Sequence, residues 1–203
     1  MFLRASTLRS IFLPAALVAG LGLAGCETQM DGLDKQTASV ETFLQITAAG
    51  AGPLGPDTRY DAKSIEAAMP GYTTGSVLIG LEGGTTNATV LFRKIYGGQV
   101  QALQILPGQG GKIGQIHGVT HHVAGPAGER PGMTFRQAGV DAATCRIGTG
   151  LWLGMAICAS RGAPNVQLTF SFKGEAAMAK ELPPAGVLAT GELQRIIWTP
   201  PPG

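Results

Sequence analysis

The clearest pattern in the chain is an alternation of apolar and polar residues near its C-terminal end. From Val166 to Phe172 every second residue is apolar, and Gln167, Thr169 and Ser171 stand between them. A two-residue period predicts a β-strand with one buried face. Similar apolar runs, most of them bounded by glycine or proline, predict seven more strands. They are about Val77–Leu81, Ala88–Tyr96, Val100–Leu106, Ile113–Val119, Cys145–Ile147, Gly154–Ala159 and Glu192–Thr199.

Two short helices are predicted, each ahead of a group of strands. Apolar residues recur at helical spacing over Ala62–Met69, and Asp57 or Thr58 is expected to cap this helix. A weaker pattern predicts a helix over Phe135–Ala143. The chain therefore runs through a helix-then-strands pattern twice.

The two passes define halves over about 46–107 and 130–203, joined by a glycine-rich segment. Gly98–Pro107 and Thr190–Pro200 both pass from polar to apolar residues after a glycine and end at a proline. This likeness suggests an internal duplication, although two glycine-bounded strands can also look alike by coincidence. We predict one α+β domain over 46–203, whose two helix-plus-antiparallel-strand halves share a mainly antiparallel sheet.

Residues 1–25 have the features of a secretory signal. Arg4 and Arg9 stand in a segment without acids, and the apolar run Ile11–Leu23 follows. This run is too short to span a membrane comfortably. The sequence therefore predicts export from the cytoplasm.

The signal ends in Leu23-Ala24-Gly25-Cys26, which resembles the lipobox of bacterial lipoproteins. In that motif the cysteine is lipidated and becomes the first residue. A buried cysteine after an ordinary signal is the alternative. Cys26 is thus the predicted lipid anchor, and the polar, acidic residues 26–45 are the predicted tether.

Charge gives no support for a nucleic-acid partner. Charged residues make up only 14% of the chain, and its formal net charge is +2. The signal holds two arginines and no acid, so its removal leaves 13 basic and 13 acidic side chains. No basic field remains to attract an anionic polymer.

If Cys26 is lipidated, Cys145 and Cys158 are the remaining cysteines. An even pair in an oxidising compartment predicts a disulfide. A metal or redox pair is the alternative, but it would need further ligands or a Cys-x-x-Cys motif, and the sequence has none. Trp152, between the two cysteines, is expected to cover the bridge or to form an exposed contact.

The candidates for chemistry are few. His117, His121 and His122 are the three histidines, and His117 and His121 are spaced so that a helix or a strand would place them on one face. Such a pair can bind Zn²⁺ or Cu²⁺, although a closed site needs two more ligands and surface histidines explain the pattern as well.

Other catalytic motifs fail on inspection. The segment Gly108–Gly114 lacks the serine or threonine that a phosphate-binding loop requires, because Ile113 follows its lysine. No serine stands in a Gly-x-Ser-x-Gly elbow. Asp57, Asp61 and Glu66 suit a helix N-terminus better than a pair of catalytic acids. We expect no catalytic residues, no metal and no cofactor.

Several segments together resemble the YfeY-like lipoproteins, a sigma-E-regulated envelope group whose domain has no known function. They are Cys26, Gly132–Phe135, Cys145 with Cys158, Leu168–Gly174 and Leu193–Trp198. The resemblance covers about Thr47–Thr199, with a longer segment here over Gly118–Glu129. It implies an outer-membrane lipoprotein with an α+β periplasmic domain, and it implies no catalytic residue.

The sequence therefore predicts a non-enzymatic binding or accessory module. The lipid anchor would hold it on the periplasmic side of the outer membrane, with the inner membrane as the less favoured site. A protein or peptide of the envelope is the expected partner. A metal-binding protein or hydrolase that uses His117 and His121 is the alternative.

Overall fold

A computed structural model describes residues 41–95 and 97–202, and an eight-stranded sheet dominates them. All neighbouring strands of this sheet are antiparallel, in the order β3-β4-β5-β6-β11-β10-β9-β8. The first predicted half supplies β3, β4 and β5, the predicted joining segment supplies β6, and the second half supplies β8 to β11, so that β6 and β11 meet in the middle of the sheet. The strands are β3 (Tyr72–Leu81), β4 (Gly84–Ile95), β5 (Gly98–Pro107), β6 (Ile113–Gly118), β8 (Cys145–Ile147), β9 (Ala156–Ser160), β10 (Ala163–Ser171) and β11 (Glu192–Trp198).

The structure also contains a separate three-stranded sheet, which was not predicted from the sequence. It consists of β1 (Leu44–Thr47), β2 (Gly50–Ala51) and β7 (Val123–Ala124), in the order β2-β1-β7. Leu44 and Ile46 are buried in the main core, and the residues between and after them are exposed. The folded part therefore starts slightly before residue 46, where the predicted tether was expected to end.

The helix α2 (Ala62–Ala68) confirms the predicted one, but its cap is different. Asp61 caps it, because Oδ1 of this residue accepts a hydrogen bond of 2.8 Å from the Ser64 backbone N–H. Asp57 instead pairs with Lys112, and Thr58 Oγ1 accepts from the Gly55 backbone N–H. The predicted caps were wrong, since the chain turns once more before the helix begins.

The second predicted helix is shorter than expected. The helix α3 (Phe135–Ala138) carries a capping box between Thr134 and Gln137, and it ends at Gly139, whose φ of 62° is left-handed. No helix among the described residues is long and apolar enough to cross a membrane. The other helical segments are η1 (Gln109–Gly111), η2 (Ala142–Thr144), η3 (Gly150–Trp152), η4 (Gly174–Met178) and α4 (Ala185–Leu188).

The strand order is symmetrical about the contact between β6 and β11. However, the two segments whose likeness suggested a duplication are β5 and β11, and they occupy unequal positions. β5 is third from one edge of the sheet, whereas β11 is fourth from the other. The likeness between these two segments thus does not follow the symmetry of the sheet.

The main hydrophobic core lies on one face of the large sheet, where α2 and β1 contribute Ile65 and Ile46. The opposite face, called the second face below, carries mixed side chains. Register places one residue from each of six strands on it. These residues are Val90, Gln104, His117, Arg195, Thr169 and Ile157.

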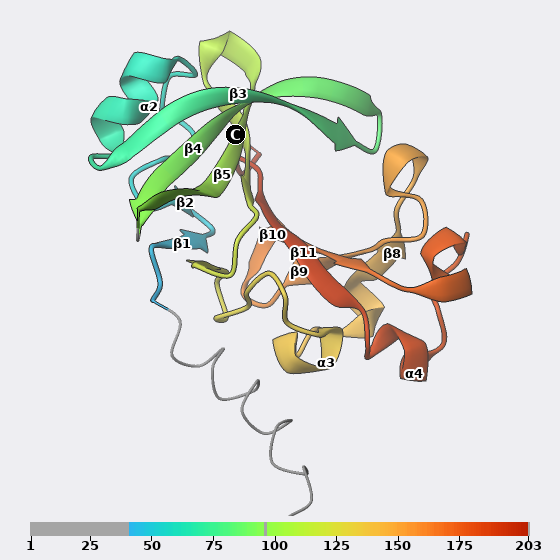
Figure 1. Cartoon of the computed structure of the whole chain (residues 1–203). Helices are drawn as coiled ribbons and strands as arrows, with labels where there is room; N and C mark the ends of the chain where they lie inside the picture. The colour runs from blue at the N-terminus through green and yellow to red at the C-terminus, as the bar shows by residue number, and fades with distance from the viewer. Residues whose placement is uncertain (1–40, 96, 203) are drawn as a thin grey trace, which may run out of the picture. The chain divides into compact units, whose positions relative to one another are not determined.

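Side chains link the two edge strands of the sheet. At the tip of the β3–β4 hairpin, Glu82 receives two hydrogen bonds, of 2.8 and 2.6 Å, from Arg146 of β8. Trp152 Nε1 donates to the Gly80 carbonyl at 3.0 Å. Gly150 lets the backbones approach, because a Cβ there would lie 1.9 Å from the Glu82 carbonyl oxygen. Figure 1 shows the end of this hairpin beside the loop that precedes β9.

Cys145 and Cys158 form a disulfide with an S–S distance of 2.07 Å, which confirms the predicted pair. The two cysteines are register partners in β8 and β9, and both contact the main core. Trp152 lies on the second face with Ile157 and Ile197. Both expectations for Trp152 were wrong, since it neither covers the bridge nor is exposed.

Candidate functional site

A chain of hydrogen-bonded polar side chains crosses the centre of the second face. Arg195 Nη1 donates to Gln104 Oε1 at 2.5 Å and to His117 Nδ1 at 3.4 Å. His117 Nε2 lies 3.2 Å from Gln115 Oε1. Because Nδ1 accepts from the arginine, the imidazole proton is on Nε2, and Nε2 donates to Gln115. Both ring nitrogens of His117 are therefore bonded.

The protein keeps His117 uncharged. Its side chain is fully buried, and its ring centroid is 6.3 Å from that of Trp152. Burial, and then the nearby charge of Arg195, lower the pKa of His117 from 6.5 to about 3. The imidazole is thus neutral at physiological pH and acts as a fixed hydrogen-bonding group.

Arg195 is a half-buried cation, and burial lowers its pKa. No carboxylate among residues 41–95 and 97–202 forms an ion pair with it. Within the same residues, its Nε and Nη2 atoms donate no hydrogen bond. Removing a charge from water without a counter-ion is costly, so this arrangement is unusual for a structural arginine.

An unsatisfied hydroxyl lies on the same face of the sheet. Thr169 is the register partner of Arg195 on the neighbouring strand β10, so the two side chains share the second face. Thr169 is fully buried, and its Oγ1 has no hydrogen-bond partner in the described part of the chain. Such groups are rare in native proteins and call for an explanation.

A cavity of about 340 Å³ opens beside the polar chain. It shares Gln115 with that chain, and Trp152, Gln167 and Ile197 also line it. Its rim is the Glu82–Arg146 pair, in which hydrogen bonds from Arg146 chiefly lower the pKa of Glu82 to about 2. The volume is in the range of small-molecule sites.

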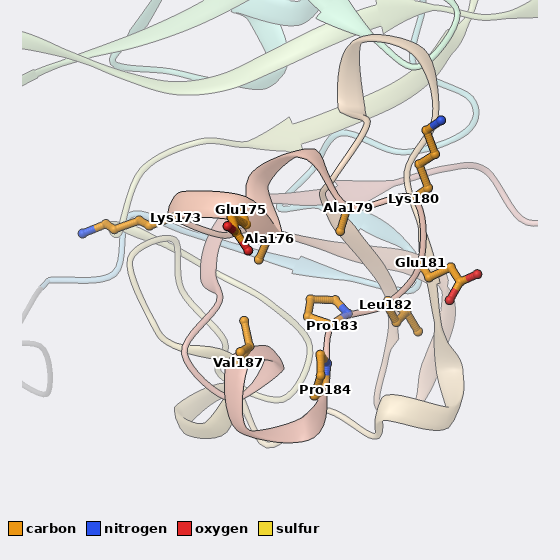
Figure 2. A pocket seen from close by; sticks show the side chains of 10 residues that line it. All are labelled: Lys173, Glu175, Ala176, Ala179, Lys180, Glu181, Leu182, Pro183, Pro184 and Val187. Carbon is orange, nitrogen blue, oxygen red and sulfur yellow. The ribbon is translucent and has the colours of Figure 1, made fainter.

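A larger hollow of about 690 Å³ lies elsewhere, over η4 and α4. Its walls are mainly alanine, leucine, proline and valine side chains, and Figure 2 shows the charged ends of Lys173, Lys180 and Glu181 pointing away from it. It contains no convergent set of polar groups. The second face is therefore the better candidate for recognition.

The structure does not place the predicted histidine pair on one face. The strand β6 ends at Gly118, so the alternation that would align His117 with His121 stops before His121. The ring of His121 lies 4.2 Å from that of His122, which stacks on Phe43. In the described ranges, no group of three or more histidine, cysteine and acidic side chains could hold a metal ion.

The other candidate side chains have local structural roles. Asp61 caps α2, and Glu66 accepts hydrogen bonds from the backbone and side chain of Thr74. Ser160 donates to the buried Glu129 at 2.7 Å. Cys26, the predicted lipidation site, lies outside the described residues.

Only a weak sign of this site is visible in the sequence. Gln104 stands between Leu103 and Ile105, a polar residue inside an apolar run. Thr169 belongs to the polar side of an alternating strand, which normally faces water. A buried polar face can be recognised only once the strand order and the covering loop are known.

Comparison with known proteins supports the fold. No protein-family model matches the sequence, and no curated protein matches it. The crystal structure of the uncharacterized protein YfeY from Escherichia coli is similar, with a TM-score of 0.57 and 19% sequence identity. The match covers 76% of this chain and 99% of that one. The chain thus has a YfeY-like fold, as the resemblance predicted.

Proposed function

We propose that this protein is a lipid-anchored, non-enzymatic binding module of the bacterial cell envelope. Cys26 would carry the lipid after removal of residues 1–25, and the residues between Cys26 and β1 would tether the domain to the periplasmic side of the outer membrane. The lipobox pattern supports the anchor, and the disulfide fits an oxidising compartment. The symmetrical strand order supports a further proposal, that the two halves arose by duplication.

One observation carries the binding role: Arg195 is half-buried without an acidic partner among the described residues. An anionic ligand on the second face would supply that partner. His117 does not favour proton transfer, because it is neutral and both of its nitrogens are engaged. The arrangement suits recognition better than catalysis.

The experiment combines lipid labelling with crosslinking in cells. Wild-type protein should incorporate a labelled fatty acid, and Cys26→Ser should not. A photo-crosslinking residue at Gln167, which lines the cavity on the second face, should trap an envelope component, whereas the same residue at the exposed Arg59 should not. Label that persists in Cys26→Ser would refute the anchor, and equal trapping from both positions would refute the binding face.

A further inference from the structure

The Arg195 guanidinium has one edge, formed by Nε and Nη2, that donates no hydrogen bond within the described residues, and this edge indicates the class of ligand. We infer that this edge binds the carboxylate of a small organic acid. The inference rests on the proposed binding role of the second face and names the chemical group that this face recognises.

The geometry leaves one edge of the guanidinium available. Gln104 and His117 both take hydrogen bonds from Nη1, which fixes the group at one corner. Nε and Nη2 then remain, and their N–H groups point in parallel along one edge of the planar group. Two parallel donors match the two oxygens of a carboxylate. Gln104 and His117 are positioning residues in this site.

The charge balance favours a carboxylate over a phosphate. Arg195 places one positive charge at the centre of this face, because His117 is neutral and Arg146 is paired with Glu82. One positive charge matches one carboxylate, whereas a dianionic phosphate would bury a second charge without a partner. The nearby Trp152 and Ile197 suit the apolar body of an organic acid.

The test uses the full chain, labelled with ¹⁵N and purified in detergent, with sodium benzoate as the probe. The Nε–H resonance of Arg195, identified by its absence in Arg195→Lys, should shift saturably against sodium chloride of equal ionic strength. Arg195→Lys should weaken benzoate binding at least tenfold. Arg59→Lys, a matched change at an exposed arginine, should leave binding unchanged.

Three results would overturn the inference. They are the absence of a saturable shift in folded wild-type protein, undiminished benzoate binding in a folded Arg195→Lys variant, and tighter binding of inorganic phosphate than of benzoate. Benzoate binding does not depend on Cys26. Loss of binding with normal lipid labelling would therefore refute the carboxylate site alone, and normal binding without lipid labelling would refute the anchor alone.

Discussion

Replacing Glu82 with glutamine removes the charge that links the β3–β4 hairpin to β8. The carboxylate accepts hydrogen bonds from Arg146 and from the backbone and hydroxyl of Thr149. These bonds, those from Arg146 first, lower the pKa of Glu82 from 4.5 to about 2. Such a change is equivalent to at most about 3 kcal/mol of folding free energy. Arg146 is 51% exposed, so solvent reduces this contribution. We expect Glu82→Gln to lower the free energy of unfolding by about 1–2 kcal/mol at pH 7.

The pH dependence of this effect has a definite sign. The pKa of Glu82 is lower in the folded chain than in the unfolded one, so its contribution is complete above about pH 5. The contribution declines below pH 4.5 and is lost as the pH approaches 2. The stabilities of wild type and Glu82→Gln should therefore converge on acidification.

Urea denaturation followed by tryptophan fluorescence measures both effects, because Trp152 donates a hydrogen bond to Gly80 beside the hairpin tip. Asp57→Asn is the matched control. Asp57 also pairs with a basic residue, but it is 91% exposed, so its replacement should cause no measurable change. Equal stability of Glu82→Gln and wild type at pH 7, or a difference at pH 3 as large as that at pH 7, would refute the reasoning.

Three further changes test other parts of the structure. Replacing Cys145 and Cys158 with alanine should lower stability by roughly 2–4 kcal/mol in chemical denaturation without changing the circular dichroism spectrum. Thr169→Val removes a buried, unsatisfied hydroxyl at nearly constant volume, so it should raise stability by about 1 kcal/mol, and a loss of stability would contradict its unpaired state. His117 should show no titration between pH 5 and 8 in NMR spectra. Its contribution to stability should be complete above pH 6.5 and should fall as the pH drops towards 3, and a titration near pH 6.5 would contradict its burial.

Local patterns were enough to predict most strands of the large sheet. The alternation at Val166–Phe172 became β10, and glycine-bounded apolar runs became its neighbours. The disulfide was also predictable, because the predicted lipidation of Cys26 would leave one cysteine pair and both of its cysteines stand in strands. These features depend on residues close together in the sequence.

The candidate site depends on distant parts of the chain, which explains why the sequence did not predict it. Gln104, His117 and Arg195 come from three strands, and they meet only because β6 lies between β5 and β11. Trp152 packs on this face because the segment η3 lies close to the tip of the β3–β4 hairpin. This close approach requires a glycine at position 150. The histidine pair failed for a similar reason, since the end of a strand is hard to locate from sequence alone.

The mass of the N-terminal peptide tests the proposal of a lipid-anchored envelope module most directly. The full-length gene product should be extracted from membranes of cells that express it, and the peptide that contains Cys26 should be analysed by mass spectrometry. The account predicts a chain that begins at Cys26 and carries the mass of attached acyl groups. A chain that begins at another residue, or an unmodified Cys26, would contradict it.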